Sequence, residues 1–243
     1  MDLDKIWMCW TDKNPLSEVR KSIISSWRNK NKNVTLVTPD NLYDFVDKKY
    51  PLHDCYNCLS SVHKADYLRV YLLHIHGGAY FDIKNPAFDI APYADKLLNS
   101  DKLGYVHIKN KNSISPCSFI LKPKSELTFH LIKLLNNYLD KYRDQLNKYP
   151  ALHARHHSGF NPSQRFDRSK YDKGYCYPLD WGYMTHIILK QSFYEFKDKL
   201  FIDFLTLKCS NYANFEEEDV LIKNTREITF IYDNNCILKI PEI

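Results

Sequence analysis

Short apolar runs alternate with segments of helical periodicity along the amino-terminal part of the chain. Residues 5–10 and 33–38 are apolar runs bounded by polar residues, and each predicts a strand. Residues 17–27 predict a helix because apolar side chains recur there on one face, and another helix is predicted from residue 41. This strand–helix–strand–helix order favours right-handed crossovers and a mainly parallel sheet.

The alternation continues further along the chain. Residues 62–75 predict an amphipathic helix, Gly77-Gly78 end it, and residues 80–83 predict a strand. Further strands are predicted at 103–108, 118–121, 200–202 and 228–232, and further helices at 126–142 and 181–190. The expected fold class is α/β, with a mainly parallel, Rossmann-like central sheet flanked by helices. The length of 243 residues favours a single domain over residues 1–243.

One long segment, residues 153–173, lacks this periodicity and is rich in histidine, arginine and lysine. Loops of that length often act as lids or are disordered. His156 and His157 could supply a late metal ligand or contact a diphosphate, but a mobile, solvated loop is the favoured interpretation.

The net charge and the lengths of the apolar runs indicate which kinds of ligand and partner the protein could bind. The net charge of +5 favours phosphorylated or nucleotide ligands, although a lysine-rich surface explains it at least as well. Because the chain has no compact basic stripe interleaved with aromatic residues, nucleic acid is not an expected partner. It has neither a signal-like leader nor a run of about 18 apolar residues. We therefore expect a cytoplasmic protein without a transmembrane segment, and contact with a membrane surface stays open.

The seven cysteines are odd in number and loosely spaced, which is not typical of a disulfide framework. Cys55 and Cys58 have the spacing of metal ligands, with His53 and His63 beside them, but zinc would need a convincing second pair. Reduced, partly buried thiols are the favoured interpretation.

The densest candidate chemistry lies between residues 63 and 84. Asp66 and Arg69 are one helical turn apart, and the strand after Gly77-Gly78 ends in Asp82. Such a strand delivers a carboxylate to the edge of the sheet where open α/β folds bind their ligands. Taken alone, Asp66 and Arg69 could be a surface ion pair contributing less than ~1 kcal/mol, and the glycines could be only a helix C-cap.

Together these residues resemble a known motif. Residues 64–69 (Lys-Ala-Asp-Tyr-Leu-Arg) and 77–82 (Gly-Gly-Ala-Tyr-Phe-Asp) are similar to the "(S/A)-D-x-x-R … G-G-x-Y-x-D-x-D" block of family-32 glycosyltransferases. The same block occurs in bacterial capsular polysaccharide synthesis proteins and in glucosylating clostridial toxins. Residues 6–10 and 19–27 also resemble the opening of these proteins. The segment 179–182 resembles a tryptophan-bearing segment of the capsular branch, so the resemblance covers about 5–95 well and 175–205 loosely.

The resemblance implies a GT-A fold and a nucleotide-sugar donor, with a UDP-sugar favoured over a GDP-sugar. It implies transfer of a hexose to a glycan or glycoconjugate hydroxyl, with retention favoured, and Mn²⁺ or Mg²⁺ as cofactor. Residues 1–100 would then form the donor-binding half, and residues 101–243 the acceptor half.

Residue roles carry over position by position. Asp66 would hold ribose or sugar hydroxyls, Arg69 would brace Asp66 or contact the sugar, and Asp82 would be the first acid of the metal motif. Asp180 could face the acceptor, although a helix N-cap explains it equally well. The donor-binding residues implied are Trp10 and Thr11 beside the base, with Asp66, Arg69, Gly78, Tyr80 and Asp82.

The sequence departs from the motif at Lys84, which stands where the second acid of Asp-x-Asp is the usual metal ligand. In one account Asp82 still binds a metal with help from a carboxy-terminal ligand and waters, and this account is slightly favoured. In the other, the Lys84 ammonium takes over part of the cation's task on the diphosphate. The catalytic candidates are therefore Asp82, Lys84 and Asp180.

Other functions compete with this one. An aspartyl-phosphate type of phosphatase would use Asp82 as nucleophile, but it also needs an acid where Lys84 stands, and it leaves Asp66 and Arg69 unexplained. A catalytically inactive nucleotide-sugar-binding protein is the non-enzymatic alternative.

Overall fold

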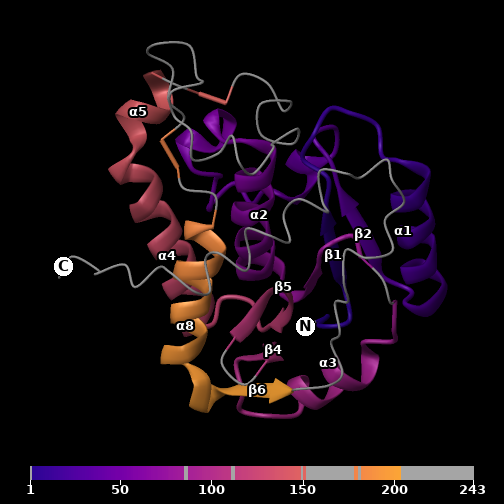
Figure 1. Ribbon diagram of the computed structural model, residues 1–243. Coiled ribbons are helices and arrows are strands. Elements are labelled where there is room, and N and C mark those ends of the chain that lie inside the picture. The colour runs from indigo at the N-terminus through magenta and orange to yellow at the C-terminus, as the bar shows by residue number, and fades with distance from the viewer. Residues whose placement is uncertain are drawn as a thin grey trace.

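The computed structural model describes residues 2–84, 87–110, 113–148, 150–151, 178–179 and 182–203. Within these residues, six strands form one sheet in the order β2-β1-β3-β5-β4-β6 (Figure 1). The strands are β1 (Ile6–Cys9), β2 (Val34–Val37), β3 (Gly78–Phe81), β4 (Gly104–Asn110), β5 (Ser113–Leu121) and β6 (Leu200–Asp203).

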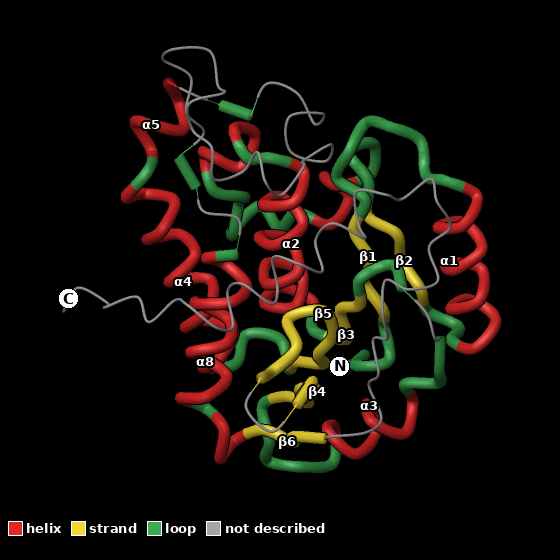
Figure 2. Tube along the Cα trace, viewed as in Figure 1, coloured by secondary structure: helices red, strands yellow, loops and turns green. Residues whose placement is uncertain are grey.

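Helices cover both faces of this sheet, as Figure 2 shows. The α-helices are α1 (Glu18–Lys30), α2 (Ser61–His76), α3 (Ala91–Leu98), α4 (Glu126–Lys141), α5 (Arg143–Lys148) and α8 (Lys190–Glu195). Shorter 3₁₀ turns are η1 (Leu42–Phe45), η2 (Asp54–Cys58) and η5 (Lys197–Lys199), and η4 (Tyr183–Leu189) is a π-helical segment that runs into α8. The expected α/β class with a helix-flanked sheet is confirmed.

The strand pairings make the sheet mixed rather than mainly parallel. Strand β1 runs parallel to β2 and β3, and β4 runs parallel to β6. Strand β5 is antiparallel to both of its neighbours, β3 and β4. Because β5 begins three residues after β4 ends, too little chain is left for the crossover that a parallel pair needs.

Alternating side chains of the strands build two cores. On one face, Ile6 and Met8 of β1 pack with apolar residues of α1 and α3. On the other face, Trp7 and Cys9 pack with α2, α4, η4 and α8. This period of two is expected for strands that are covered on both sides.

Helix α2 differs from the sequence prediction in its burial. The predicted stripe included Val62 and Ala65, which are only half-buried, whereas residues 66–75 are all buried. The helix lies between the sheet and the α4–η4 layer, so it is covered on more than one side. A buried helix of this kind holds its polar residues within the protein rather than on a solvated face.

Serine caps set where three of the helices begin. Ser17, Ser60 and Ser125 accept hydrogen bonds from backbone N–H groups three residues further on, at the starts of α1, α2 and α4. The helix predicted from residue 41 is only the 3₁₀ turn η1. Of the other predicted elements, the strand at 228–232 and the loop at 153–173 lie outside the described residues.

Gly78 begins β3 with a φ of 94°, and an added Cβ would lie 2.5 Å from the carbonyl oxygen of Lys5, the residue just before β1. Gly78→Ala is therefore expected to destabilise the fold by about 2 kcal/mol, since both backbone strain and this contact oppose it. The unfolding temperature should fall by about 4–8 °C. Ser22→Ala on the exposed face of α1 is the control, and equal melting of the two variants would contradict the close approach of β1 and β3.

Candidate functional site

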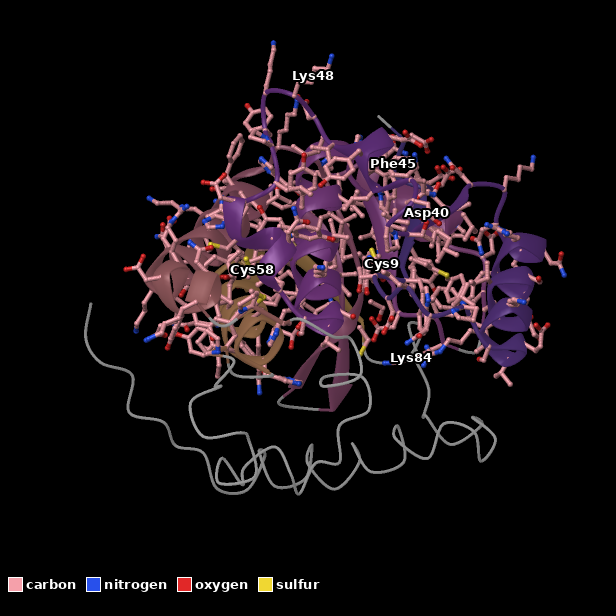
Figure 3. The ribbon with its side chains drawn as sticks, turned by 90° about the horizontal axis from the view of Figure 1, so that it is seen from above. Cys9, Asp40, Phe45, Lys48, Cys58 and Lys84 are labelled. Carbon is pink, nitrogen blue, oxygen red and sulfur yellow. The ribbon has the colours of Figure 1, made fainter. Side chains whose placement is uncertain are left out.

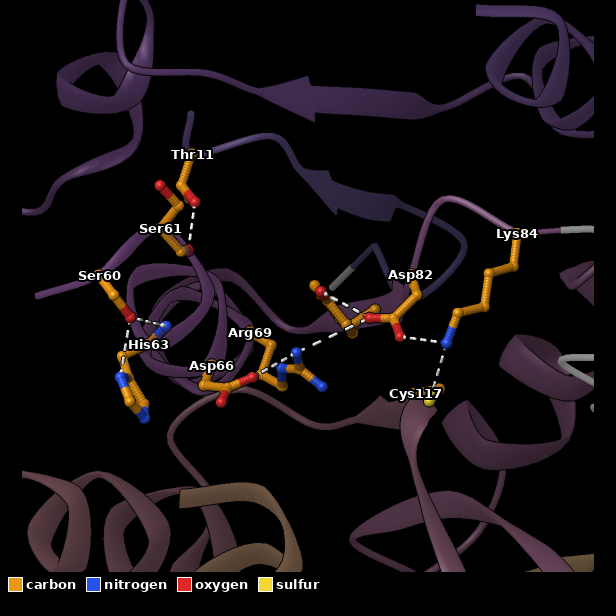
Figure 4. Close-up of polar contacts among 10 residues, drawn as sticks. Thr11, Ser60, Ser61, His63, Asp66, Arg69, Asp82, Lys84 and Cys117 are labelled. Carbon is orange, nitrogen blue, oxygen red and sulfur yellow. Dashed lines mark hydrogen bonds and ion pairs between the residues drawn. The ribbon is translucent and has the colours of Figure 1, made fainter. Parts of the chain in front are cut away.

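Three elements converge at one edge of the sheet. Because β1 and β3 are parallel, Trp10 and Thr11 after β1 and Asp82 after β3 emerge at the same edge. The first turn of α2 lies at this edge too, since the Thr11 hydroxyl donates a hydrogen bond to the Ser61 carbonyl oxygen (Figure 4). The carboxyl ends of parallel strands are where open α/β sheets bind ligands.

Four charged side chains form a continuous row at this edge, hereafter the charged cluster (Figure 4). An Arg69 Nη2 atom lies 2.6 Å from Asp66 Oδ1 and 3.7 Å from Asp82 Oδ1. Lys84 Nζ lies 2.7 Å from Asp82 Oδ2. Asp66 and Arg69 are therefore not the surface pair that the sequence left open, because their side chains are only 4% and 7% exposed.

Strands β3 and β5 supply further contacts to this cluster. The Tyr80 hydroxyl donates to Asp82 Oδ1 at 3.0 Å, and the Arg69 guanidinium lies 4.7 Å from the centre of the Tyr80 ring. On β5, the carbonyl oxygen of Cys117 accepts a hydrogen bond from the Asp82 backbone N–H at 3.0 Å. The Sγ atom of Cys117 lies 3.2 Å from Lys84 Nζ. Asp82 is thus held through its backbone and through both carboxylate oxygens.

Helix α1 holds the segment that follows Asp82. The indole N–H of Trp27 donates to the Lys84 carbonyl oxygen at 2.8 Å. Asn31 donates to the Phe88 carbonyl at 2.8 Å and accepts from the Ile90 N–H at 3.0 Å. The sequence placed Trp27 only on an apolar helix face and did not single out Cys117, because both contacts depend on long-range packing.

The neighbouring charges set the ionisation of the cluster. Burial alone would raise the pKa of Asp82, but Lys84 and Arg69 outweigh it and hold that pKa well below its ordinary range. Burial raises the pKa of the Cys117 thiol, and Asp82 raises it further. The cluster therefore combines two carboxylates with two cations, beside a neutral thiol.

This donor set does not fit a divalent metal on Asp82. Among the described residues, no group of three or more His, Cys, Asp or Glu side chains is arranged to hold an ion. Lys84 already contacts one oxygen of Asp82, and Tyr80 and Arg69 contact the other. Two like unit charges about 4 Å apart repel by about 4 kcal/mol at an effective dielectric constant of ~20, so a metal beside Lys84 would be opposed.

The remaining predicted donor residues lie at different places. Trp10 is at the same edge, where its indole N–H donates to the Asn14 carbonyl at 2.7 Å and its ring lies 5.0 Å from the Arg20 guanidinium. Gly78 begins β3, at the opposite end of that strand from Asp82. The structure thus brings Trp10 to the same edge of the sheet as the charged cluster but does not bring Gly78 there.

The other sequence predictions concern Asp180, the histidines at 156 and 157, and the cysteine pair at 55 and 58. Asp180 lies outside the described residues, as do His156 and His157. Cys55 and Cys58 are free thiols, both within η2, and His63 is hydrogen-bonded to Ser60 at the start of α2. The structure therefore supplies no second pair of ligands for zinc among the residues that it describes.

The fold is a helix-flanked α/β sheet, and its charged side chains lie just past the carboxyl ends of two parallel strands. In open α/β proteins this edge of the sheet is where ligands bind. Within this class of α/β proteins, the chain belongs to the family of capsular polysaccharide synthesis proteins, which residues 1–210 match. A search of curated proteins gave no significant match.

Among solved structures, the chain is similar to one described as "PaToxG Glycosyltransferase", with 14% sequence identity and a TM-score of 0.39. The similarity covers 59% of this chain, and the chain spans only 63% of the length of that one. No helix in the described ranges combines the length and apolar character that a bilayer crossing requires.

Proposed function

We propose that this protein is a glycosyltransferase whose nucleotide-sugar donor binds at the carboxyl edge of β1 and β3. The observation that carries the proposal is the charged cluster, in which Asp66 and Arg69 of α2 meet Asp82 and Lys84 after β3. Membership of the capsular polysaccharide synthesis family supports it, since building a polysaccharide requires glycosyl transfer.

The chemistry of the cluster suits such a donor. Breaking the sugar–phosphate bond leaves negative charge on the diphosphate, and cations that are already in place stabilise that charge in the transition state. Lys84 and Arg69 are two such cations, and the Asp82 side chain between them remains 20% exposed. Because the Lys84 and Arg69 side chains are each only 7% exposed, a diphosphate would have to displace the Asp82 carboxylate to contact both cations.

The donor's other parts are assigned by position. Asp66 would hold ribose or sugar hydroxyls, and the 2.6 Å contact from Arg69 fits the bracing role. Trp10 and Thr11 would lie beside the base. Asp180 would face the acceptor, and the acceptor half would comprise residues 101–243.

Finer features of the proposal rest on the sequence resemblance. They are a GT-A fold, a UDP-sugar in preference to a GDP-sugar, a hexose moved to a glycan or glycoconjugate hydroxyl, and retention of configuration. The phosphatase alternative is less favoured, because Asp82 is already engaged by donors on both oxygens and is poorly placed as a nucleophile.

Thermal unfolding with added UDP or GDP tests the proposal. A nucleotide at about 100 times its dissociation constant should stabilise the protein by about 2.7 kcal/mol, and this raises the unfolding temperature by several degrees. Hydrolysis of a panel of UDP- and GDP-sugars then separates an active transferase from an inactive binding protein. Failure of both nucleotides and of every donor to shift the unfolding temperature would overturn the proposal.

A further inference from the structure

Lys84 occupies the position at which the resembling motif has its metal-binding acid, and its ammonium is buried against Asp82. We propose that Lys84 is a built-in cation that replaces the divalent ion, so that a nucleoside diphosphate binds at this edge without metal. This inference rests on the proposed function and specifies how the same site recognises its donor.

The charge balance of the cluster supports this assignment. Asp66 and Asp82 carry two negative charges, and Arg69 and Lys84 carry two positive ones. A site that recruits Mg²⁺ normally presents uncompensated carboxylate oxygens, whereas both oxygens of Asp82 are already contacted by donors. The cluster therefore has little excess negative charge with which to attract a divalent ion, and it already presents an ammonium.

The position of Lys84 is fixed from three directions. Its Nζ contacts Asp82 Oδ2 at 2.7 Å and Cys117 Sγ at 3.2 Å. Its carbonyl oxygen accepts the indole hydrogen bond of Trp27 at 2.8 Å. A lysine held in this way has already lost much of its side-chain entropy, so less is lost when it binds a ligand. As a compact point charge, an ammonium serves any oxygen of a diphosphate.

Calorimetric titration of UDP and of GDP, each with EDTA and with Mn²⁺, tests the inference on the full chain. The wild type should bind its preferred nucleotide with the same dissociation constant in both buffers. Lys84→Met removes the charge and should weaken binding in EDTA by about 10- to 100-fold. Lys84→Asp restores the two-acid motif and should bind only when Mn²⁺ is added.

Lys48→Met is the matched control, because Lys48 is exposed and lies on the opposite side of the molecule from Lys84 in the view from above (Figure 3). It should bind as the wild type does. Titration of Mn²⁺ alone, followed by its electron paramagnetic resonance signal, gives a readout without nucleotide. The wild type should leave Mn²⁺ free, and Lys84→Asp should bind it.

The outcomes separate this inference from the proposed function. Wild-type binding that weakens about tenfold or more in EDTA and recovers with Mn²⁺ would overturn the built-in cation while leaving the donor site intact. That comparison needs only the wild type, so it decides the question even if a Lys84 variant fails to fold. Absence of binding of either nucleotide in both buffers would overturn the proposed function, and this inference with it.

Discussion

Replacement of Asp82 by asparagine is expected to lower kcat/KM for glycosyl transfer by about 10²- to 10³-fold, the range seen when one preorganised electrostatic group is lost. Asp82 links the two cations of the site, Lys84 at 2.7 Å and Arg69 at 3.7 Å. The amide keeps the shape of the side chain but removes the charge that holds both cations in place. Initial rates with the best donor of the UDP- and GDP-sugar panel provide the measurement.

Asp40→Asn is the control for this variant, because Asp40 is exposed and carries the same change of charge. Turnover by Asp82→Asn equal to that of the control would refute the assigned role of Asp82. A comparison of melting temperatures shows whether any loss of rate reflects unfolding rather than chemistry.

A comparison of the wild type with Asp82→Asn also shows how the stability of the fold depends on pH. The pKa of Asp82 is depressed in the folded state by Lys84 and Arg69, which outweigh the opposing effect of burial. Its contribution to stability is therefore fully present above the ordinary pKa of about 3.9 and is lost as the pH falls through the folded value. The stability difference between wild type and Asp82→Asn should accordingly shrink below about pH 4.

Replacement of Arg69 by methionine is expected to destabilise the fold by about 3–5 kcal/mol, the usual cost of removing one partner from a buried ion pair. The Asp66 side chain is 4% exposed and would lose the guanidinium that lies 2.6 Å away. Asp82 would lose its second cation at the same time. Urea denaturation monitored by circular dichroism measures the change.

The chain contains a matched exposed pair for comparison. Lys21 and Glu18 have the same spacing of three residues on α1 and contact at 2.7 Å, but their side chains are 55% and 88% exposed. Lys21→Met should leave the denaturation midpoint nearly unchanged, because solvent screens such pairs. If Arg69→Met and Lys21→Met had equal midpoints, burial of the Arg69 pair would contribute nothing to stability.

The sequence located the helices and strands well where one short-range pattern was enough. The helix carrying Asp66 and Arg69 was predicted at 62–75 and is observed as Ser61–His76. The strand before Asp82 was predicted two residues late, because its first pairing residue is a glycine, Gly78, next to a helix end. Local patterns therefore identified the elements that bear the site, with small errors at their boundaries.

The arrangement between elements was harder to predict. Nothing in the pattern of β5 showed that it would insert antiparallel between β3 and β4, since strand order is decided by long-range pairing. For the same reason the contacts of Lys84 with Cys117 and Trp27 were not foreseen, although the exceptional lysine itself was evident from the motif. The residue types of the site could be read from the sequence, but their contacts could not.

The hydrogen bond from Trp27 to the Lys84 carbonyl joins residues that are 57 positions apart. It makes the alignment of the site depend on a peripheral helix that contributes no charged group to the cluster. Circular permutations and fusions near the amino terminus therefore have to preserve the position of α1 against the sheet. A substitution in α1 that moves Trp27 would therefore act on the backbone of Lys84 without changing any residue of the charged cluster.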